Sequence, residues 1–222
     1  SLFQETAIRL KPSREVEFGA PVVVTSDDFR FVVAEQLQGI GIDPGPVLIE
    51  PQAKNTAPAV LAAALDALSR DTDAILLVCP SDHFIPDTAT FHSAVAKGLQ
   101  SVVEGNLVTF GVIPTRPETG YGYLEVNKVD GVHPNEVTKF VEKPCENDAK
   151  NMIETGRYLW NAGIFLFRAR DMVTAFEKYR PQLIVPVTEA LKKSRADLGF
   201  IRLDKKSWDD CESVAIDYAI ME

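Results

Sequence analysis

The stretch that decides the fold is residues 74–83, AILLVCPSDH, in which a run of apolar residues stops at Pro80. A short apolar run with such a stop is typical of a central strand in a sheet that is covered on both faces. Asp82 then lies at the carboxyl end of the strand, where open α/β sheets bind their ligands. A carboxylate at this place suits a metal ion or a sugar, and capping of the next turn explains a lone loop aspartate equally well.

Composition excludes several classes of protein. The 222 residues are enough for one large α/β domain or two small ones, and 45% hydrophobic residues are ordinary for a globular chain. A net charge of −9 argues against nucleic-acid binding but leaves room for a small phosphorylated ligand. We recognise no signal peptide and no apolar stretch of membrane-spanning length, so we expect a cytoplasmic protein without membrane contact.

The spacing of cysteines and histidines predicts neither a disulfide framework nor a zinc site. Cys79, Cys145 and Cys211 lie far apart, which fits a reducing compartment, and Cys79 is expected to fill the core. The histidines at 83, 92 and 133 show no ligand spacing.

Strand-like and helix-like segments alternate in the first half of the chain. Strands are expected at 21–25, 47–50, 74–79 and 107–111, and helices at 27–39, 55–69 and 91–104. Repeated strand–helix units predict a largely parallel sheet. In the second half, longer strands are expected at 121–129, 137–142 and 158–167, and helices at 148–155, 170–179 and 181–194. We interpret this half as an acceptor-binding portion added to the sheet.

Two loop strings have compositions that suit ligand binding. Residues 50–58, EPQAKNTAP, join a strand end to a helix amino terminus, which offers free N–H groups to an anionic or polar ligand. Capping by Asn55 or Thr56 is the alternative interpretation. Residues 119–123, TGYGY, place glycines between aromatic residues, which allows either close approach to a ligand or a simple turn into a strand.

Four polar residues stand at the ends or in the middle of apolar segments. Glu142 and Lys143 could take a hydroxyl and a phosphate from one sugar phosphate, although such pairs are common on surfaces. Asn161 interrupts an apolar strand, so its amide needs a partner if buried, either a polar ligand or a core group. Asp217 adds a second acid next to an apolar run and on its own would be a helix cap.

In this order the strings resemble the sugar-1-phosphate nucleotidyltransferase family, most closely its mannose-1-phosphate guanylyltransferase branch. The resemblance covers residues 1–222 and rests on EP (50–51), NTAP (55–58), PSDH (80–83), TGYGY (119–123), EKP (142–144), WNAG (160–163) and IDY (216–218). It implies a Rossmann-like mixed, mostly parallel sheet with helices on both faces. It also implies an enzyme that converts GTP and mannose 1-phosphate into GDP-mannose and pyrophosphate, in line and with Mg²⁺.

The resemblance also assigns roles to residues of this sequence. Asp82 and Asp217 are expected to hold the metal ion and, with Lys143 on the sugar phosphate, to be catalytic. The sugar-phosphate contacts are expected at Gly122, Tyr123, Glu142, Lys143, Asn161 and Gly163. The nucleotide contacts are expected at Glu50, Lys54, Asn55, Thr56, Ser81 and Asp82. One domain would then have a nucleotide-binding half at 1–115 and a sugar-phosphate-binding half at 116–222.

The chain departs from the family in several places. Members begin with a central strand and a glycine-rich loop that cradles the triphosphate, and nothing like them precedes residues 1–6. We therefore expect neighbouring strands to lack a partner, and the chain to be incomplete for catalysis. The family's carboxyl-terminal β-helical or isomerase regions also have no counterpart here. Phe29 and Lys54 stand where the branch often has histidine and arginine.

Two alternatives stay open at this point. One is a glucose-1-phosphate uridylyl- or thymidylyltransferase of the same family, which residues 55–58 disfavour. The other is a non-catalytic subunit that binds a nucleotide sugar. The oligomeric state is equally open, a homodimer included.

Overall fold

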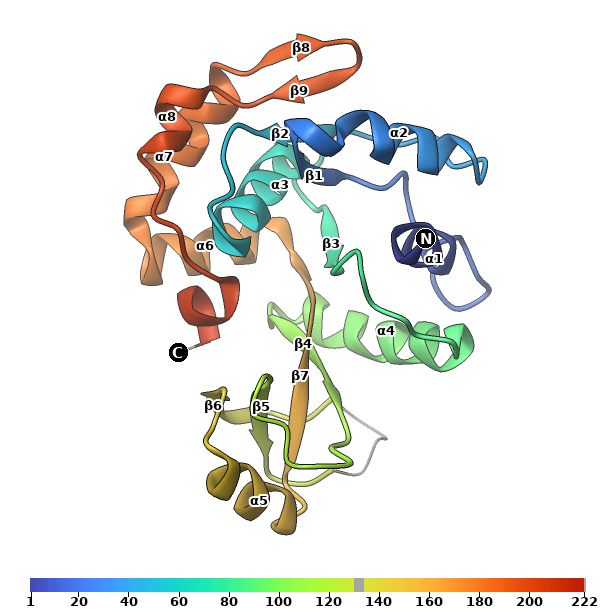
Figure 1. Cartoon of the computed structure of the whole chain (residues 1–222), viewed down its shortest axis with the longest axis vertical. Helices are drawn as coiled ribbons and strands as arrows, with labels where there is room; N and C mark the ends of the chain where they lie inside the picture. The colour runs from blue at the N-terminus through green and yellow to red at the C-terminus, as the bar shows by residue number, and fades with distance from the viewer. Residues whose placement is uncertain (130–133, 222) are drawn as a thin grey trace.

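The computed structural model describes residues 1–129 and 134–221, and its strands form two sheets (Figure 1). The strands are β1 (Val23–Ser26), β2 (Val47–Glu50), β3 (Ile75–Val78), β4 (Val108–Val112), β5 (Gly122–Val126), β6 (Val137–Glu142), β7 (Tyr158–Arg168), β8 (Arg195–Asp197) and β9 (Phe200–Arg202). The four-stranded sheet has the order β1-β2-β9-β8. In the five-stranded sheet the order is β3-β7-β5-β6, and β4 also pairs with β7.

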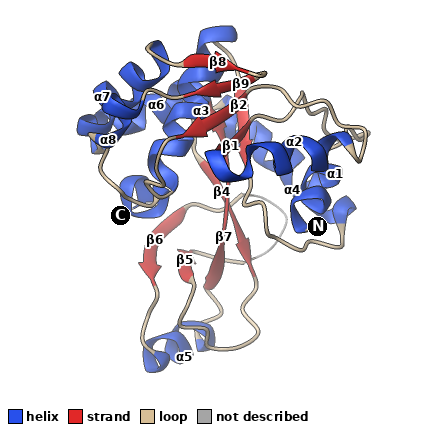
Figure 2. Cartoon of the chain, turned by 45° about the horizontal axis from the view of Figure 1, so that its top comes forward, coloured by secondary structure: helices blue, strands red, loops and turns tan. Residues whose placement is uncertain are grey.

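Helices cover both sides of the four-stranded sheet and of the carboxyl-terminal part of β7 (Figure 2). They are α1 (Leu2–Arg9), α2 (Arg30–Gln38), α3 (Thr56–Arg70), α4 (Thr88–Val103), α5 (Glu146–Glu154), α6 (Ala169–Tyr179), α7 (Pro181–Lys192) and α8 (Lys205–Asp209). A 3₁₀ turn, η1 (Asp27–Phe29), precedes α2, and a π-helical turn, η2 (Asp217–Met221), follows α8. Helices α3, α6, α7 and α8 lie on one side, and α1, α2 and α4 lie on the other. Among the described residues, no helix combines the length and the apolar composition needed to cross a bilayer.

Side chains of β2 show how the sheet separates two cores. Leu48 packs in the large cluster with α3 and α7, whereas Val47 and Ile49 pack with Phe200 and with Ala34 of α2. Successive side chains of a strand point to opposite faces. Val47, Leu48 and Ile49 are all buried because helices cover both faces of β2. This confirms the α/β fold with helices on both faces that the family resemblance implies.

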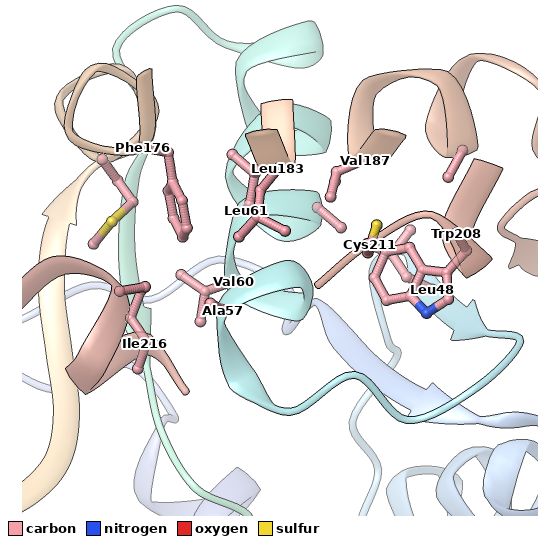
Figure 3. Close-up of a cluster of buried hydrophobic side chains, with 14 of the residues drawn as sticks. Leu48, Ala57, Val60, Leu61, Phe176, Leu183, Val187, Trp208, Cys211 and Ile216 are labelled. Carbon is pink, nitrogen blue, oxygen red and sulfur yellow. The ribbon is translucent and has the colours of Figure 1, made fainter. Parts of the chain in front are cut away.

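The largest core lies between α3 and the helices of the second half (Figure 3). Leu61 of the alanine-rich helix α3 meets Phe176 of α6 and Leu183 of α7 in this cluster, which also includes Trp208. The indole N–H of Trp208 donates to the carbonyl of Gln52 at 2.8 Å, so its one polar group is satisfied. This core therefore joins the loop after β2 to the carboxyl-terminal part of the chain.

The prediction of a largely parallel sheet is wrong for the described strands. Only β1 with β2 and β2 with β9 are parallel, and the other five of the seven pairings are antiparallel. The reason is β7, which inserts between β3 and β4 and pairs with both in antiparallel fashion. Repeated strand–helix units indicate that β3 and β4 have the same direction, but they do not reveal a strand that enters between them from far along the chain.

The interpretation of residues 74–79 as a central, fully buried strand is also wrong within the described part of the chain. Strand β3 pairs only with β7, and Ile75 is 39% exposed. Strand β1 likewise pairs only with β2 among the described strands. Each of these two strands therefore has one edge without a partner among the described strands.

The predicted halves at 1–115 and 116–222 stay a prediction, and strand pairing crosses their boundary in both sheets. Strand β9 pairs with β2, and β7 pairs with β3 and β4. Gly131 and His133 lie outside the described residues.

Helix α7 offers a matched test of this core. Leu183 is fully buried in the large cluster, whereas Val185 of the same helix is 67% exposed. We expect Leu183→Ala to lower the free energy of unfolding by about 2–5 kcal/mol, because it leaves a cavity among packed side chains. Val185→Ala should change it by less than about 0.5 kcal/mol. Denaturant unfolding of both variants checks this. Equal losses of unfolding free energy in the two variants would contradict the packing of Leu183 in this core.

Candidate active site

The predicted site residues gather along one edge of β7. Residues 165 and 166 pair with both β3 and β4, and Trp160 pairs with both β4 and β5. A residue in a sheet has one partner strand on each side, so β4 must lie on the side of β7 opposite to β3 and also opposite to β5. Strands β3 and β5 therefore lie along the same edge of β7, and β4 lies along the other. On this shared edge, β3 pairs with residues 165–168 and β5 pairs with residues 158–160. Residues 161–164 lie in the interval between these two pairings. Asn161 and Gly163 are in this interval.

The loop after β3 reaches the same interval. A Cβ placed on Gly163 would lie 3.7 Å from Cγ of Pro80, two residues before Asp82. The loop is also held from α1, because Nη2 of the buried Arg9 donates to the carbonyl of His83 at 2.7 Å. Ser81 and Asp82 are exposed on this loop, at the carboxyl end of β3 as predicted.

Asp217 comes from the other end of the sequence and meets Asn161. Nδ2 of Asn161 donates to Oδ1 of Asp217 at 2.6 Å. The backbone on both sides is anchored: the N–H of Ile216 donates to Oγ1 of Thr56 at 2.8 Å, and Nη2 of Arg180 donates to the carbonyl of Tyr218 at 2.8 Å. The structure thus brings together the two acids' loops, which lie 135 positions apart in the sequence.

The electrostatic environment of Asp217 disfavours its negative charge. Burial raises the pKa of its carboxyl above the ordinary value, and the nearby Glu142 carboxylate raises it further. The hydrogen bond from Asn161 and the charge of Lys143 act in the opposite direction. A carboxylate that is destabilised in this way gains from a cation, and a bound metal ion would supply one.

Glu142 and Lys143 lie at the end of β6, on the side of the site facing Asp217. Nζ of Lys143 is 3.0 Å from Oε1 of Glu142, and this hydrogen bond is the main cause that raises the pKa of Lys143. The Lys143 side chain is 59% exposed, so its ammonium is accessible to a ligand, whereas Glu142 is 14% exposed. Gly122 faces Glu142 across the ladder, and a Cβ there would lie 2.7 Å from Oε2 of Glu142. The same Cβ would also lie 2.8 Å from ring atoms of Phe140, so glycine leaves room for both side chains here.

The family profile for nucleotidyl transferases matches residues 2–214, nearly the whole chain. The chain belongs to this family. This confirms the resemblance that the ordered motifs carry, and it agrees with a site built at strand ends around β7.

Curated relatives of this nucleotidyl transferase match it over its entire length. The xanthan biosynthesis protein XanB of Xanthomonas campestris pv. campestris (strain B100) is 42% identical over 222 residues, 100% of this chain and 46% of that protein. A mannose-1-phosphate guanylyltransferase of Sinorhizobium fredii (strain NBRC 101917 / NGR234) is 42% identical over 100% of this chain and 43% of its own. The mannose-1-phosphate guanylyltransferase of Escherichia coli (strain K12) is 39% identical over 100% of this chain and 47% of its own length. The chain spans about half the length of these relatives.

Solved structures share the fold. A protein of Helicobacter pylori named mannose-6-phosphate isomerase superposes with a TM-score of 0.86 at 29% identity, over 100% of this chain and 84% of that chain. A protein of Thermus thermophilus named mannose-1-phosphate geranyltransferase superposes with a TM-score of 0.80 at 30% identity, over 100% of this chain and 61% of that chain. Both confirm the fold class of this nucleotidyl transferase.

The residues predicted to contact the nucleotide are only partly free to do so. Nζ of Lys54 donates to the carbonyl of Asp209 at 2.9 Å, which directs it toward α8. Asn55 caps α3 through the N–H of Thr56 at 2.9 Å, so the capping interpretation applies to it as well. Glu50 is different, because burial raises the pKa of its carboxyl and Oε2 has no hydrogen-bond partner among the described residues. Oε2 is itself buried, so a ligand would reach it only if this part of the chain rearranged.

Tyr123 has a structural role in this nucleotidyl transferase. Its side chain is fully buried, and its hydroxyl donates to the carbonyl of Glu118 at 2.9 Å and accepts from the N–H of Glu118 at 3.0 Å. The predicted contact of Tyr123 with a sugar phosphate stays a prediction, and this geometry favours an indirect effect through the turn at 118–121.

Two residues that support the site, Thr109 and Arg180, were missed from the sequence, and so was Arg202. Thr109 bonds to Asn161, Arg180 to the backbone of Tyr218, and Arg202 lines a cavity of about 280 Å³ at the carboxyl ends of β1, β2 and β9. The remaining lining residues of this cavity are Asp27, Ile49, Pro51, Leu203 and Lys205. Arg202 had no sequence signal because the three-residue strand β9 shows no periodicity.

The donor set is compatible with a hard divalent cation. The described residues contain no group of three or more histidine, cysteine, aspartate or glutamate side chains that could hold a metal ion. Asp82 and Asp217 would therefore supply only two carboxylates. Oxygen donors of this kind would suit Mg²⁺, which keeps several water and phosphate oxygens as ligands and needs few protein groups.

Replacing Asp217 with its neutral isostere should stabilise the fold. The raised pKa of Asp217 means that the folded chain holds the proton more tightly than the unfolded chain. Stability from this group is therefore lost as the pH rises through its folded-state pKa. We expect Asp217→Asn to melt above the wild type at neutral pH, with a difference that shrinks in acid. Thermal unfolding at both pH values checks this, and the exposed Asp210→Asn is the control. A lower melting temperature at neutral pH would contradict it.

Proposed function

We propose that the protein is a mannose-1-phosphate guanylyltransferase, which forms GDP-mannose and pyrophosphate from GTP and mannose 1-phosphate. The observation that carries the proposal is the cluster of Glu142, Lys143, Asn161 and Asp217 around residues 161–164. It offers a cation and hydrogen-bonding groups for a sugar phosphate next to a carboxylate that gains from a metal ion. Relatives that are 39–42% identical over the whole chain carry the same activity in their names.

The proposed reaction is one displacement at phosphorus. An oxygen of the sugar phosphate attacks the α-phosphorus of GTP, the new P–O bond forms, and the bond to the bridging oxygen breaks as pyrophosphate leaves. Two anionic reactants must meet, so the barrier is largely electrostatic. Lys143 would bind the attacking phosphate, and Glu142 would accept a hydrogen bond from a sugar hydroxyl and so orient the sugar. No covalent intermediate with the protein is needed.

Asp82 and Asp217 would hold Mg²⁺, whose charge neutralises the phosphates when it is bound. The role of Asn161 follows from its bond to Asp217: it fixes the orientation of the carboxylate. The loop after β3 carries Asp82 toward the same interval, and the anchor from Arg9 to His83 restricts where this loop can lie.

The base and ribose would be bound at residues 50–56 and at Ser81. Glu50 is a candidate to accept an N–H of the base if ligand binding exposes Oε2, which is buried without a hydrogen-bond partner among the described residues. Guanine presents such N–H donors side by side on its Watson–Crick edge. Asn55 and Thr56 would contribute as the rim of the site, since both already have structural partners.

Pyrophosphate release tests this proposal and separates it from the alternatives. The full-length protein and the 222-residue chain are assayed with Mg²⁺ against GTP, UTP and dTTP, each with mannose 1-phosphate or glucose 1-phosphate. We expect GTP with mannose 1-phosphate to be the best pair. A preference for UTP or dTTP with glucose 1-phosphate would support the first alternative. Binding of GDP-mannose without any release would support a non-catalytic subunit.

Lys143 offers the sharpest single-residue test of the mechanism. We expect Lys143→Ala to lower kcat/KM for mannose 1-phosphate by about 100-fold or more, the usual loss for one preorganised donor in the transition state. Lys139→Ala is the matched control, because Lys139 is an exposed lysine of β6, the strand that ends just before Lys143. Steady-state kinetics check this. A loss below about tenfold, or an equal loss in the control, would remove Lys143 from the site.

A further inference from the structure

The side-chain amide of Asn161 is held on both of its ends. Nδ2 donates to Oδ1 of Asp217 at 2.6 Å, whereas Oδ1 accepts from the N–H of Gly163 at 3.2 Å and from Oγ1 of Thr109 at 3.1 Å. The Asp217 carboxylate, which only accepts, and the Gly163 N–H, which only donates, determine which end of the amide faces Asp217, and the Thr109 hydroxyl adds a donor to the oxygen in that orientation. If the amide were flipped, its oxygen would face the Asp217 carboxylate and its NH₂ would face the N–H of Gly163.

A bulge in β7 makes this arrangement possible. Thr109 pairs with Phe165 and Gly111 pairs with Asn161, so two steps along β4 correspond to four along β7. Gly163 lies within the extra length and has φ of +64°, a conformation that favours glycine. Bulges of this kind redirect side chains and backbone groups next to active sites. Here the bulge turns the N–H of Gly163 back to Asn161 and brings Thr109 within reach of it.

The hydroxyl of Thr109 has two acceptors within reach. It lies 3.1 Å from Oδ1 of Asn161 and 3.2 Å from the carbonyl of Ile164, and the side chain is half-buried in β4. Both acceptors belong to the bulged segment of β7. Within the described residues, the hydroxyl of Thr109 thus contacts β7 at Asn161 and Ile164.

We propose that Thr109 is a positioning residue: its hydroxyl fixes the amide of Asn161, and through it the carboxylate of Asp217 that takes the divalent cation. The role of Asp217 as a cation ligand rests on the proposed function, whereas the hydrogen-bonded chain does not. Partners of this kind around a metal site typically change metal affinity or activity by about 10- to 100-fold when they are removed.

Mn²⁺ binding measures the effect without turnover. The full-length protein is titrated with Mn²⁺ in the presence of GDP-mannose, and free Mn²⁺ is followed by electron paramagnetic resonance. We expect Thr109→Val, which keeps the shape but removes the donor, to raise the Kd for Mn²⁺ about tenfold. Thr109→Ser restores the hydroxyl and should bind within about twofold of the wild type. In turnover, Thr109→Val should lower kcat far more than it changes KM for mannose 1-phosphate.

A matched threonine provides the control. Thr138 of β6 is exposed and its hydroxyl donates to the carbonyl of Glu125 at 3.3 Å, so Thr138→Val makes the same chemical change away from Asn161. Its Kd for Mn²⁺ should equal that of the wild type. If Thr109→Val fails to fold, Thr109→Ala removes the donor without placing a methyl group against the amide.

The outcomes separate this inference from the proposed function. A folded Thr109→Val that binds Mn²⁺ as the wild type does, or a Thr109→Ser that fails to restore binding, overturns the positioning role. If the wild type still releases pyrophosphate in that case, the proposed function stands and only the positioning role is overturned. A Thr109-dependent Kd in a protein that releases no pyrophosphate would support the positioning role and remove the proposed reaction.

Discussion

Strand β7 is the constraint on which the rest of the structure depends. It pairs with β4 along one edge and with β3 and β5 along the other, so it fixes the strand ends of both halves of the chain relative to one another. The interval at residues 161–164 exists because no single strand fills that second edge. Polar groups can gather there without interrupting a continuous ladder. The same interval contains the bulge that aims Asn161 at Asp217.

The site opposes the stability of the fold at Asp217. Burial and the Glu142 carboxylate both raise its pKa, yet the segment around it is anchored by Thr56 and Arg180. Packing alone would favour an asparagine at this position, because it could accept the same bond from Asn161 with no charge to bury. Residues that conflict with local stability in this way are typical of functional sites. This conflict marks Asp217 as a candidate functional residue.

Much of the fold follows from the sequence because its strands and helices have clear patterns. The strands at 47–50 and 137–142 have the predicted bounds, and most other predicted elements end within two or three residues of those observed. Helix α1 and strands β8 and β9 were not predicted, since β8 and β9 have three residues each and carry no period. Sheet direction was predicted wrongly because it depends on β7, whose insertion between β3 and β4 is a long-range pairing that local patterns do not encode.

The same reasoning separates the parts of the site that sequence can and cannot reveal. Asn161 and Asp217 stand out because a polar residue inside or beside an apolar run must find a partner. Thr109 does not stand out, because threonine is an ordinary residue for a half-buried strand. Its contact with Asn161 arises only when the bulge at Gly163 shifts the register of β7 against β4. A residue that acts through another becomes visible only with its neighbours, so supporting residues are the part of a site that needs the structure most.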